Sequence, residues 1–207
     1  MRYAILSTVC SGRMNYDMAA DAVEQPRLAQ LAFIVLQDDG VLPGVFMLIK
    51  PDGWKMDSDT VEATGVTTEL LNRDGVPVGE AIKAYANLIE TGHVIAAYGA
   101  AHHLKLMRGE MRRAGVDDLW SVTQYIDIMR AMTTWCAIPN KNRKGYKFPK
   151  FEEACAFIGA KCPTLRAAPI SASLTWQMFE DLRTHGLLPL PKTSDNEGIN
   201  HESNRKY

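Results

Sequence analysis

The stretch that most constrains the fold of this chain is residues 3–12, with the sequence YAILSTVCSG. It is an apolar run that ends at a Ser-Gly break, a pattern typical of a buried strand that leads into a loop. Alternate side chains of a strand share one face, so Ser7 and Val9 point the same way. We therefore predict a buried first strand around which the later segments pack.

The rest of the chain indicates a mixed α/β fold. Residues 27–36 and 44–50 are predicted strands, and the Asp-Gly turn at 37–40 between them favours an antiparallel meander. Two further strands are expected at 93–98 and 122–128. Helical spacing and glycine stops predict helices at 59–63, 67–71, 80–89, 101–114, 129–136, 150–158 and 171–184. This order predicts a mixed central sheet flanked by helices, with residues 1–187 as one domain and 188–207 as a polar, flexible tail.

Composition excludes several classes of protein. A length of 207 residues suits a single domain, and 46% hydrophobic residues with a net charge of -1 fit neither a disordered chain nor a strongly basic nucleic-acid binder. There is no apolar run long enough to cross a bilayer, and the N-terminal run is too short for a secretory signal. The four cysteines are scattered without a CxxC pair, which predicts free thiols in a reducing, cytoplasmic compartment.

Several short segments carry a family resemblance through their order and spacing. They are residues 25–32 (QPRLAQLA), 63–69 (ATGVTTE), 112–115 (RRAG), and 136–139 (CAIP) followed by 145–150 (GYKFPK). Together they resemble the proofreading-type 3′-to-5′ exonucleases of the DnaQ-like, DEDDh superfamily, and the last pair is similar to a loop of one bacterial and phage branch. The resemblance implies a ribonuclease-H-like fold over about residues 3–187.

The same resemblance implies that the catalytic positions are degenerate. Members of the superfamily hold two Mg or Mn ions with four carboxylates, and a histidine is the general base. The corresponding positions here are Ser7, Val9, His103, Arg166 and Ser171. Arg166 replaces the histidine, and the other four replace the acidic residues. The resemblance therefore implies an exonuclease-like protein with no intact catalytic residue and no metal cofactor.

Losing the carboxylates changes the charge of the cleft. Arg166 adds a permanent positive charge, and we expect His103 to add part of another. Ser7, Ser171 and Arg166 would then offer donors to a phosphate without a metal ion. The alternative is that these positions have lost their catalytic role and now serve only to pack the fold, and the apolar Val9 fits this alternative. Asp127 matches an acidic position often found near the site in the family, but one carboxylate does not make a two-metal centre.

Three histidines, His93, His102 and His103, also suggest a metal cluster, but the predicted strand at 93–98 separates the first from the other two. Adjacent histidines also point to different faces of a helix. We therefore predict no metal site there.

Two basic segments are candidates for nucleic-acid contact. Residues 141–150 combine five basic residues with two aromatics, a combination used to bind single strands. The candidate contacts, with Arg166, are Lys141, Arg143, Lys144, Tyr146 and Lys147. The alternative is a solvated loop whose aromatic residues anchor it to the core. A second set, on the helix predicted at 101–114, is either a solvated face or an extension of the nucleic-acid path; its members are Lys105, Arg108, Arg112 and Arg113.

Three functions remain open from the sequence. The favoured one is binding of single-stranded nucleic acid or a nucleotide without hydrolysis. The second is a protein-interaction module that regulates or partners a nuclease or polymerase. The third is a metal-dependent exonuclease whose ligands come from the loop after the first strand, such as Asp17 or Asp21. None of the three involves a membrane partner.

Overall fold

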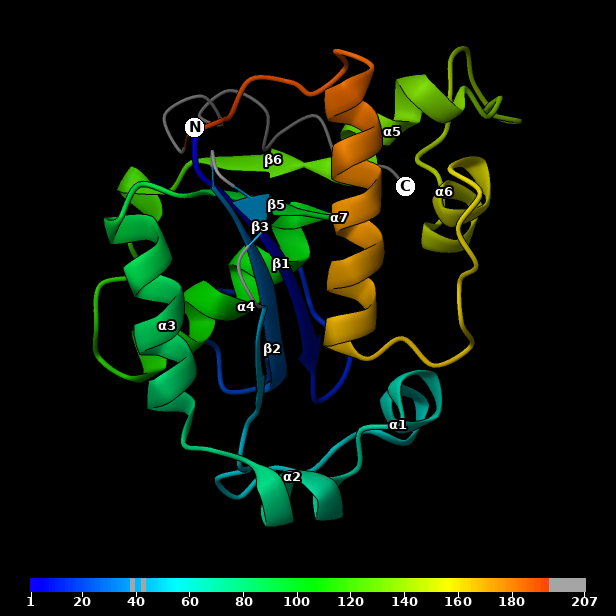
Figure 1. The fold of residues 1–207 in the computed structure, drawn as a ribbon. Coiled ribbons are helices and arrows are strands. Elements are labelled where there is room, and N and C mark those ends of the chain that lie inside the picture. Colours follow the sequence, from blue (N-terminus) through cyan, green and yellow to red (C-terminus); the bar gives the residue numbers. More distant parts are fainter. Residues whose placement is uncertain (38–39, 42–43, 194–207) are drawn as a thin grey trace.

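The computed structural model describes residues 1–37, 40–41 and 44–193, and its centre is a six-stranded mixed sheet (Figure 1). The strand order is β3-β2-β1-β5-β6, with β4 also pairing to β2. The strands are β1 (Tyr3–Cys10), β2 (Leu28–Gln37), β3 (Gly40–Val41), β4 (Val45–Leu48), β5 (Val94–Ala97) and β6 (Tyr125–Asp127). β1 runs antiparallel to β2 and parallel to β5, so the first strand lies inside the sheet as predicted.

Helices cover both faces of this sheet. They are α1 (Ser58–Thr64), α2 (Thr68–Asp74), α3 (Val78–Glu90), α4 (Ala100–Arg113), α5 (Ile128–Cys136), α6 (Phe151–Phe157) and α7 (Ala168–Thr184). Alternate residues of β1 belong to different cores: Ala4 and Leu6 pack with α3 and α4, whereas Ile5 packs with α5, α6 and α7. The predicted mixed α/β architecture is confirmed.

The boundaries of several elements differ from the sequence expectation. α7 begins three residues earlier than predicted because Pro169 lies in its first turn, where a missing N–H costs nothing. β4 is shorter than the predicted 44–50 strand, and the two-residue β3 was not predicted. Of the expected Asp-Gly turn, Asp38 and Asp39 lie outside the described residues.

The cations of α4 attach loops to the helix, so they do not form a free solvated face; their part in a nucleic-acid path stays a prediction. Lys105 Nζ donates to the carbonyls of Asn15, Tyr16 and Met18 at 3.0, 2.9 and 2.6 Å. The three arginines are paired as well, Arg108 and Arg112 with Asp118 and Arg113 with Glu110. Sequence periodicity places these residues on the helix but does not show what they contact.

Gly109 provides a test of how tightly the loop before β2 packs on α4. A Cβ at this position would lie 2.3 Å from the carbonyl oxygen of Ala20, a backbone atom. Gly109→Ala is therefore expected to destabilise the protein by about 1–3 kcal/mol, although alanine favours a helix by about 1 kcal/mol over glycine. Urea unfolding measures the change. Gly79→Ala in α3, where a Cβ meets nothing within 4 Å, is the control and is expected to be neutral or stabilising.

The first residues of the predicted tail contact the sheet. Lys192 exchanges two backbone hydrogen bonds with Tyr125 of β6, at 2.8 and 2.9 Å, and Leu188 packs against the core around α7. The remainder of the predicted tail, 194–207, lies outside the described residues. Among the helices in the described part of the chain, none has the length and apolarity that a membrane span requires.

Candidate functional site

A cavity of about 490 Å³ opens beside the carboxyl half of β1. Its walls also include α1, the residues after β5, and the starts of α4, α6 and α7. All five positions that the family resemblance gave as degenerate line it: Ser7, Val9, His103, Arg166 and Ser171. The fold thus brings together residues that are as much as 164 positions apart (171 minus 7).

His103 is a buried, neutral residue that joins α4 to β1. Its Nδ1 accepts from the backbone N–H of Thr8 at 3.1 Å and lies 2.7 Å from the Thr8 hydroxyl. Burial lowers the pKa of His103 to about 3, so the ring carries no charge near pH 7. The expectation that His103 contributes positive charge to the cleft is therefore wrong, because a ring inside the fold loses the solvation that its charged form needs.

Arg166 keeps its charge but has an acidic partner. Its guanidinium lies 3.2 Å from Glu152 of α6, and its backbone N–H donates to the carbonyl of Ala63. The Ser171 hydroxyl lies 3.5 Å from the Arg166 carbonyl oxygen. The side-chain ion pair is exposed to solvent, so it is weak and an incoming anion can compete for Arg166.

The side chains around this cavity do not suit a pair of hard divalent cations. Among the residues the structure describes there, the polar groups are hydroxyls, a thiol, imidazoles and one guanidinium, without a carboxylate. Mg²⁺ and Mn²⁺ bind preferentially to carboxylate oxygens. Over residues 1–37, 40–41 and 44–193 no three His, Cys, Asp or Glu side chains gather as a metal-binding group. No catalytic step through metal ions follows from these residues.

Cys10, His102 and Tyr16 form a chain of contacts that the sequence interpretation missed. Cys10 Sγ lies 3.8 Å from Nε2 of His102, and Nδ1 of His102 lies 3.1 Å from the Tyr16 hydroxyl. Burial lowers the pKa of His102 and raises the pKa of the Cys10 thiol, so both are neutral near pH 7. From the sequence, His102 was considered only as a metal ligand. Its contacts are with residues 92 and 86 positions away, which no local spacing indicates.

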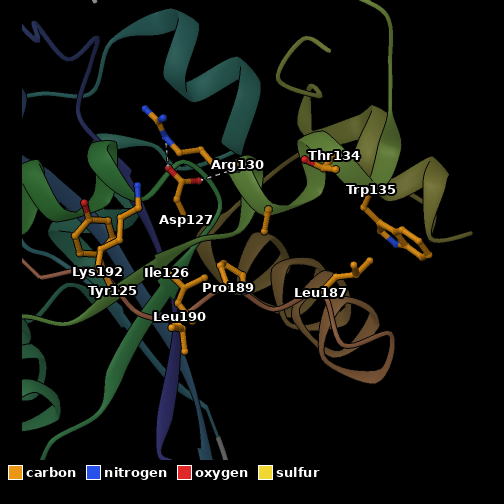
Figure 2. Close-up of a pocket in the computed structure, with 11 residues that line it drawn as sticks. Tyr125, Ile126, Asp127, Arg130, Thr134, Trp135, Leu187, Pro189, Leu190 and Lys192 are labelled. Atoms are coloured by element: carbon orange, nitrogen blue, oxygen red, sulfur yellow. Dashed lines mark hydrogen bonds and ion pairs between the residues drawn. The ribbon is translucent and has the colours of Figure 1, made fainter. Parts of the chain in front are cut away.

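Two other predicted candidates lie away from this cavity. Asp127 caps the N-terminus of α5, accepting from Arg130 N at 3.2 Å and from Gly99 N at 3.3 Å, and it lines a different cleft (Figure 2). Burial raises the pKa of Asp127. His93 lies at the start of β5, where its Nδ1 is 3.0 Å from the Thr91 hydroxyl. Asp127 therefore has a structural role that its position in the sequence did not show.

The basic loop is a short hairpin whose two aromatic side chains are about half-exposed, and the ring of Phe148 contacts Arg130 of α5. Pro139 and Tyr146 form a bridge, and both Tyr146 and Phe148 are 51% exposed, so they do not anchor the loop in the core. Lys147 is paired with Glu153 at 2.6 Å. The other candidate cations of the loop are exposed: Lys141, Arg143 and Lys144.

The loop lies next to the cavity. The Tyr98 hydroxyl donates to the carbonyl of Pro149 at 2.7 Å, and Tyr98 and Phe151 both line the cavity wall. The loop ends at Pro149 and α6 begins two residues later with Phe151. Cations and exposed aromatics therefore adjoin a cavity that contains an arginine and several hydroxyls.

The order of the strands and the helices that cover the sheet define a ribonuclease-H-like fold. Solved structures show the same fold: Escherichia coli exonuclease I in complex with a dA16 oligonucleotide has a TM-score of 0.71 and 16% identity, covering 88% of this chain and 41% of that chain. A structure described as 3′-end specific recognition of histone mRNA stem-loop by 3′-exonuclease has a TM-score of 0.71 and 9% identity, covering 91% of this chain and 84% of that chain.

These likenesses show the fold alone. The chain spans about two fifths of the length of the exonuclease I chains, because 41% of the first of them is covered. No family model matches the sequence, and no curated protein matches it either.

Proposed function

We propose that this chain is a catalytically degenerate 3′-5′ exonuclease-like protein that binds single-stranded nucleic acid, or a nucleotide, without two-metal hydrolysis. The observation that carries the proposal is the cavity, which is lined by the five positions that the family resemblance gave as degenerate and otherwise by hydroxyls, a thiol and an imidazole. A phosphate there meets donors rather than carboxylates. The neighbouring loop supplies exposed cations and two half-exposed rings, a combination suited to a single strand.

Two neighbours of this fold support the choice of ligand. The exonuclease I structure is a complex with a dA16 oligonucleotide, and the second neighbour is described as recognising an mRNA stem-loop. By analogy of fold we place the 3′ end of a strand in the cavity and the preceding nucleotides on the loop of residues 141–150. The cytoplasmic location expected from the sequence belongs to this proposal.

Binding is tested by fluorescence anisotropy of a labelled oligothymidylate of about twelve nucleotides, in EDTA, at roughly 50 to 200 mM salt. We expect affinity to fall as salt rises, because binding to phosphates releases counterions. Lys144→Ala is expected to weaken binding about 2- to 10-fold and to reduce the salt slope by about 0.7, the value for one phosphate contact on a single strand. Lys147→Ala is expected to have a smaller effect, since Lys147 is already paired with Glu153.

The controls separate loop contact from general charge. Lys83→Ala, on α3 and away from the loop, is expected to leave affinity unchanged. Arg166→Ala is expected to weaken the binding of a nucleoside monophosphate, which is small enough to occupy the cavity alone. Equal losses for Lys144→Ala and Lys83→Ala would contradict the proposed path.

Hydrolysis is measured in the same mixtures after adding manganese or magnesium. We expect no release of nucleotides by the natural chain. Release that depends on metal would overturn the degenerate interpretation and favour the active nuclease, with Asp17 or Asp21 as ligands. Neither is among the described residues that line the cavity, and Asp21 lies 3.7 Å from Arg112 in an ion pair.

The interaction module that regulates or partners a nuclease or polymerase remains the second candidate. A separate apolar cleft favours it; the cleft adjoins the basic loop where the Arg130 guanidinium lies 5.3 Å from the centre of the Phe148 ring.

A further inference from the structure

A second cleft, of about 430 Å³, lies between β6, α5 and residues 187–192 (Figure 2). Its walls are held in place by contacts of their own. Lys192 is bonded to Tyr125 through both backbone groups, and Leu187 N donates to Leu182 O at 2.8 Å. The Trp135 indole N–H donates to Asp181 at 2.7 Å. The cleft is therefore preformed, as binding sites usually are.

The two ends of the cleft differ in chemistry. In Figure 2, Leu187 and Trp135 lie at one end and Lys192 at the other, with Pro189 and Leu190 between them. Leu190 is 87% exposed and lines this cleft, so a ligand bound there would remove apolar surface from water. Apolar surface of this kind, bordered by polar residues, marks interaction sites.

The cationic end retains positive charge. The Lys192 side chain is exposed, and the Arg130 guanidinium is half-exposed and lies 3.7 Å from Asp127, a long ion pair. The Asp127 carboxylate is already engaged by the N–H groups of Gly99 and Arg130. Two cations face one carboxylate, so the end attracts an anion.

We propose that this cleft binds a short peptide segment of a partner protein in which apolar side chains adjoin acidic ones. The apolar side chains would occupy the space among Pro189, Leu190 and Trp135, and the carboxylates would pair with Lys192 and Arg130. The cleft is then the surface through which the chain would act as an interaction module. This proposal does not depend on nucleic-acid binding.

Two other occupants fit less well. A nucleobase has hydrogen-bond donors and acceptors along its edge. Among the described residues that line the apolar part of the cleft, the Thr134 hydroxyl is the one side-chain group that could pair with them. Burying unpaired polar edges costs binding energy. A second copy docked symmetrically on this face would bring like cations together, because a two-fold interface uses the same patch twice.

The test uses the full chain and three labelled peptides in anisotropy titrations. They are Gly-Asp-Leu-Leu-Glu-Gly, its basic analogue Gly-Lys-Leu-Leu-Lys-Gly and its polar analogue Gly-Asp-Ser-Ser-Glu-Gly. We expect the first to bind with a Kd below about 1 mM and each of the others to bind at least about tenfold more weakly.

Two exposed positions serve as variants that keep the fold. Lys192→Glu and Leu190→Asp are each expected to weaken the acidic-apolar peptide about tenfold, whereas Lys83→Glu on α3 is expected to have no effect. Thermal unfolding confirms that the variants are folded.

Three outcomes would overturn the proposal. The first is absence of binding by the acidic-apolar peptide, or binding that both cleft variants leave unchanged. The second is tighter binding of a nucleoside monophosphate that Lys192→Glu abolishes, which would assign the cleft to a nucleotide. The third is self-association in sedimentation experiments that Leu190→Asp abolishes, which would assign it to a second copy.

Discussion

Glu110→Ala is expected to lower the free energy of unfolding by about 3–5 kcal/mol, because it leaves buried donors without their acceptor. The Glu110 side chain is 1% exposed. Its oxygens accept from Arg27 Nε at 2.9 Å, from the Leu28 backbone N–H at 2.9 Å and from Arg113 at 3.2 Å. One carboxylate on α4 therefore holds the beginning of β2 and the loop before it.

The loss is larger than that of an ordinary ion pair for a geometric reason. Arg113 also donates to the carbonyls of Ala20 and Ala22, so the same network holds the loop that contacts Gly109. Removing Glu110 leaves two partly buried guanidinium groups facing each other, which adds repulsion to the lost hydrogen bonds.

Urea unfolding of Glu110→Ala measures this loss, with Glu80→Ala as the control. Glu80 forms an exposed pair with Lys83 at 3.1 Å, and such pairs contribute about 0–1 kcal/mol. Glu110→Gln is expected to fall between the two, since the amide oxygen can still accept from Leu28. Equal effects of the Glu110 and Glu80 substitutions would show that the buried network contributes little.

The parts of the fold that were predicted correctly depend on local pattern. β1 is predicted by an apolar run that ends at a glycine, and α3 and α4 by apolar spacing and terminal glycines. Glu110 has no such signal. In the sequence Glu110 resembles the other charged residues of α4. Its burial depends on the ion pair with Arg27, which is 83 positions away.

In the candidate site, too, the positions were predictable from sequence motifs, whereas the effects of distant contacts were not. The family motifs indicated which five positions would meet, and the structure brings them to one cavity. The charge of that cavity was not predictable from the sequence. Burial keeps His103 neutral, and the ion pair with Glu152 partly offsets the charge of Arg166. Both effects depend on distances in the fold and not on residue type.

Acidification is expected to destabilise the protein through His103. Its folded-state pKa, about 3, lies well below the value of 6.5 for an unburied histidine. Below about pH 6.5 the unfolded chain therefore binds a proton at His103 that the folded chain does not bind. The contribution of His103 to the free energy of unfolding is complete above that pH and is lost as pH falls toward 3. Between about pH 7.5 and 5 the expected loss is about 2 kcal/mol. The lowered pKa of His102 acts in the same direction, and the raised pKa of Asp127 acts in the opposite one.

His103→Gln isolates this contribution. A glutamine amide oxygen can still accept from Thr8 but does not titrate, so the variant is expected to lose stability at neutral pH and to show a flatter pH dependence, with about 2 kcal/mol less change between about pH 7.5 and 5. Urea unfolding at both pH values measures it. An unchanged slope in His103→Gln would mean that this ring takes up a proton over the same pH range in the folded and the unfolded chain, and the cavity would then gain positive charge as pH falls.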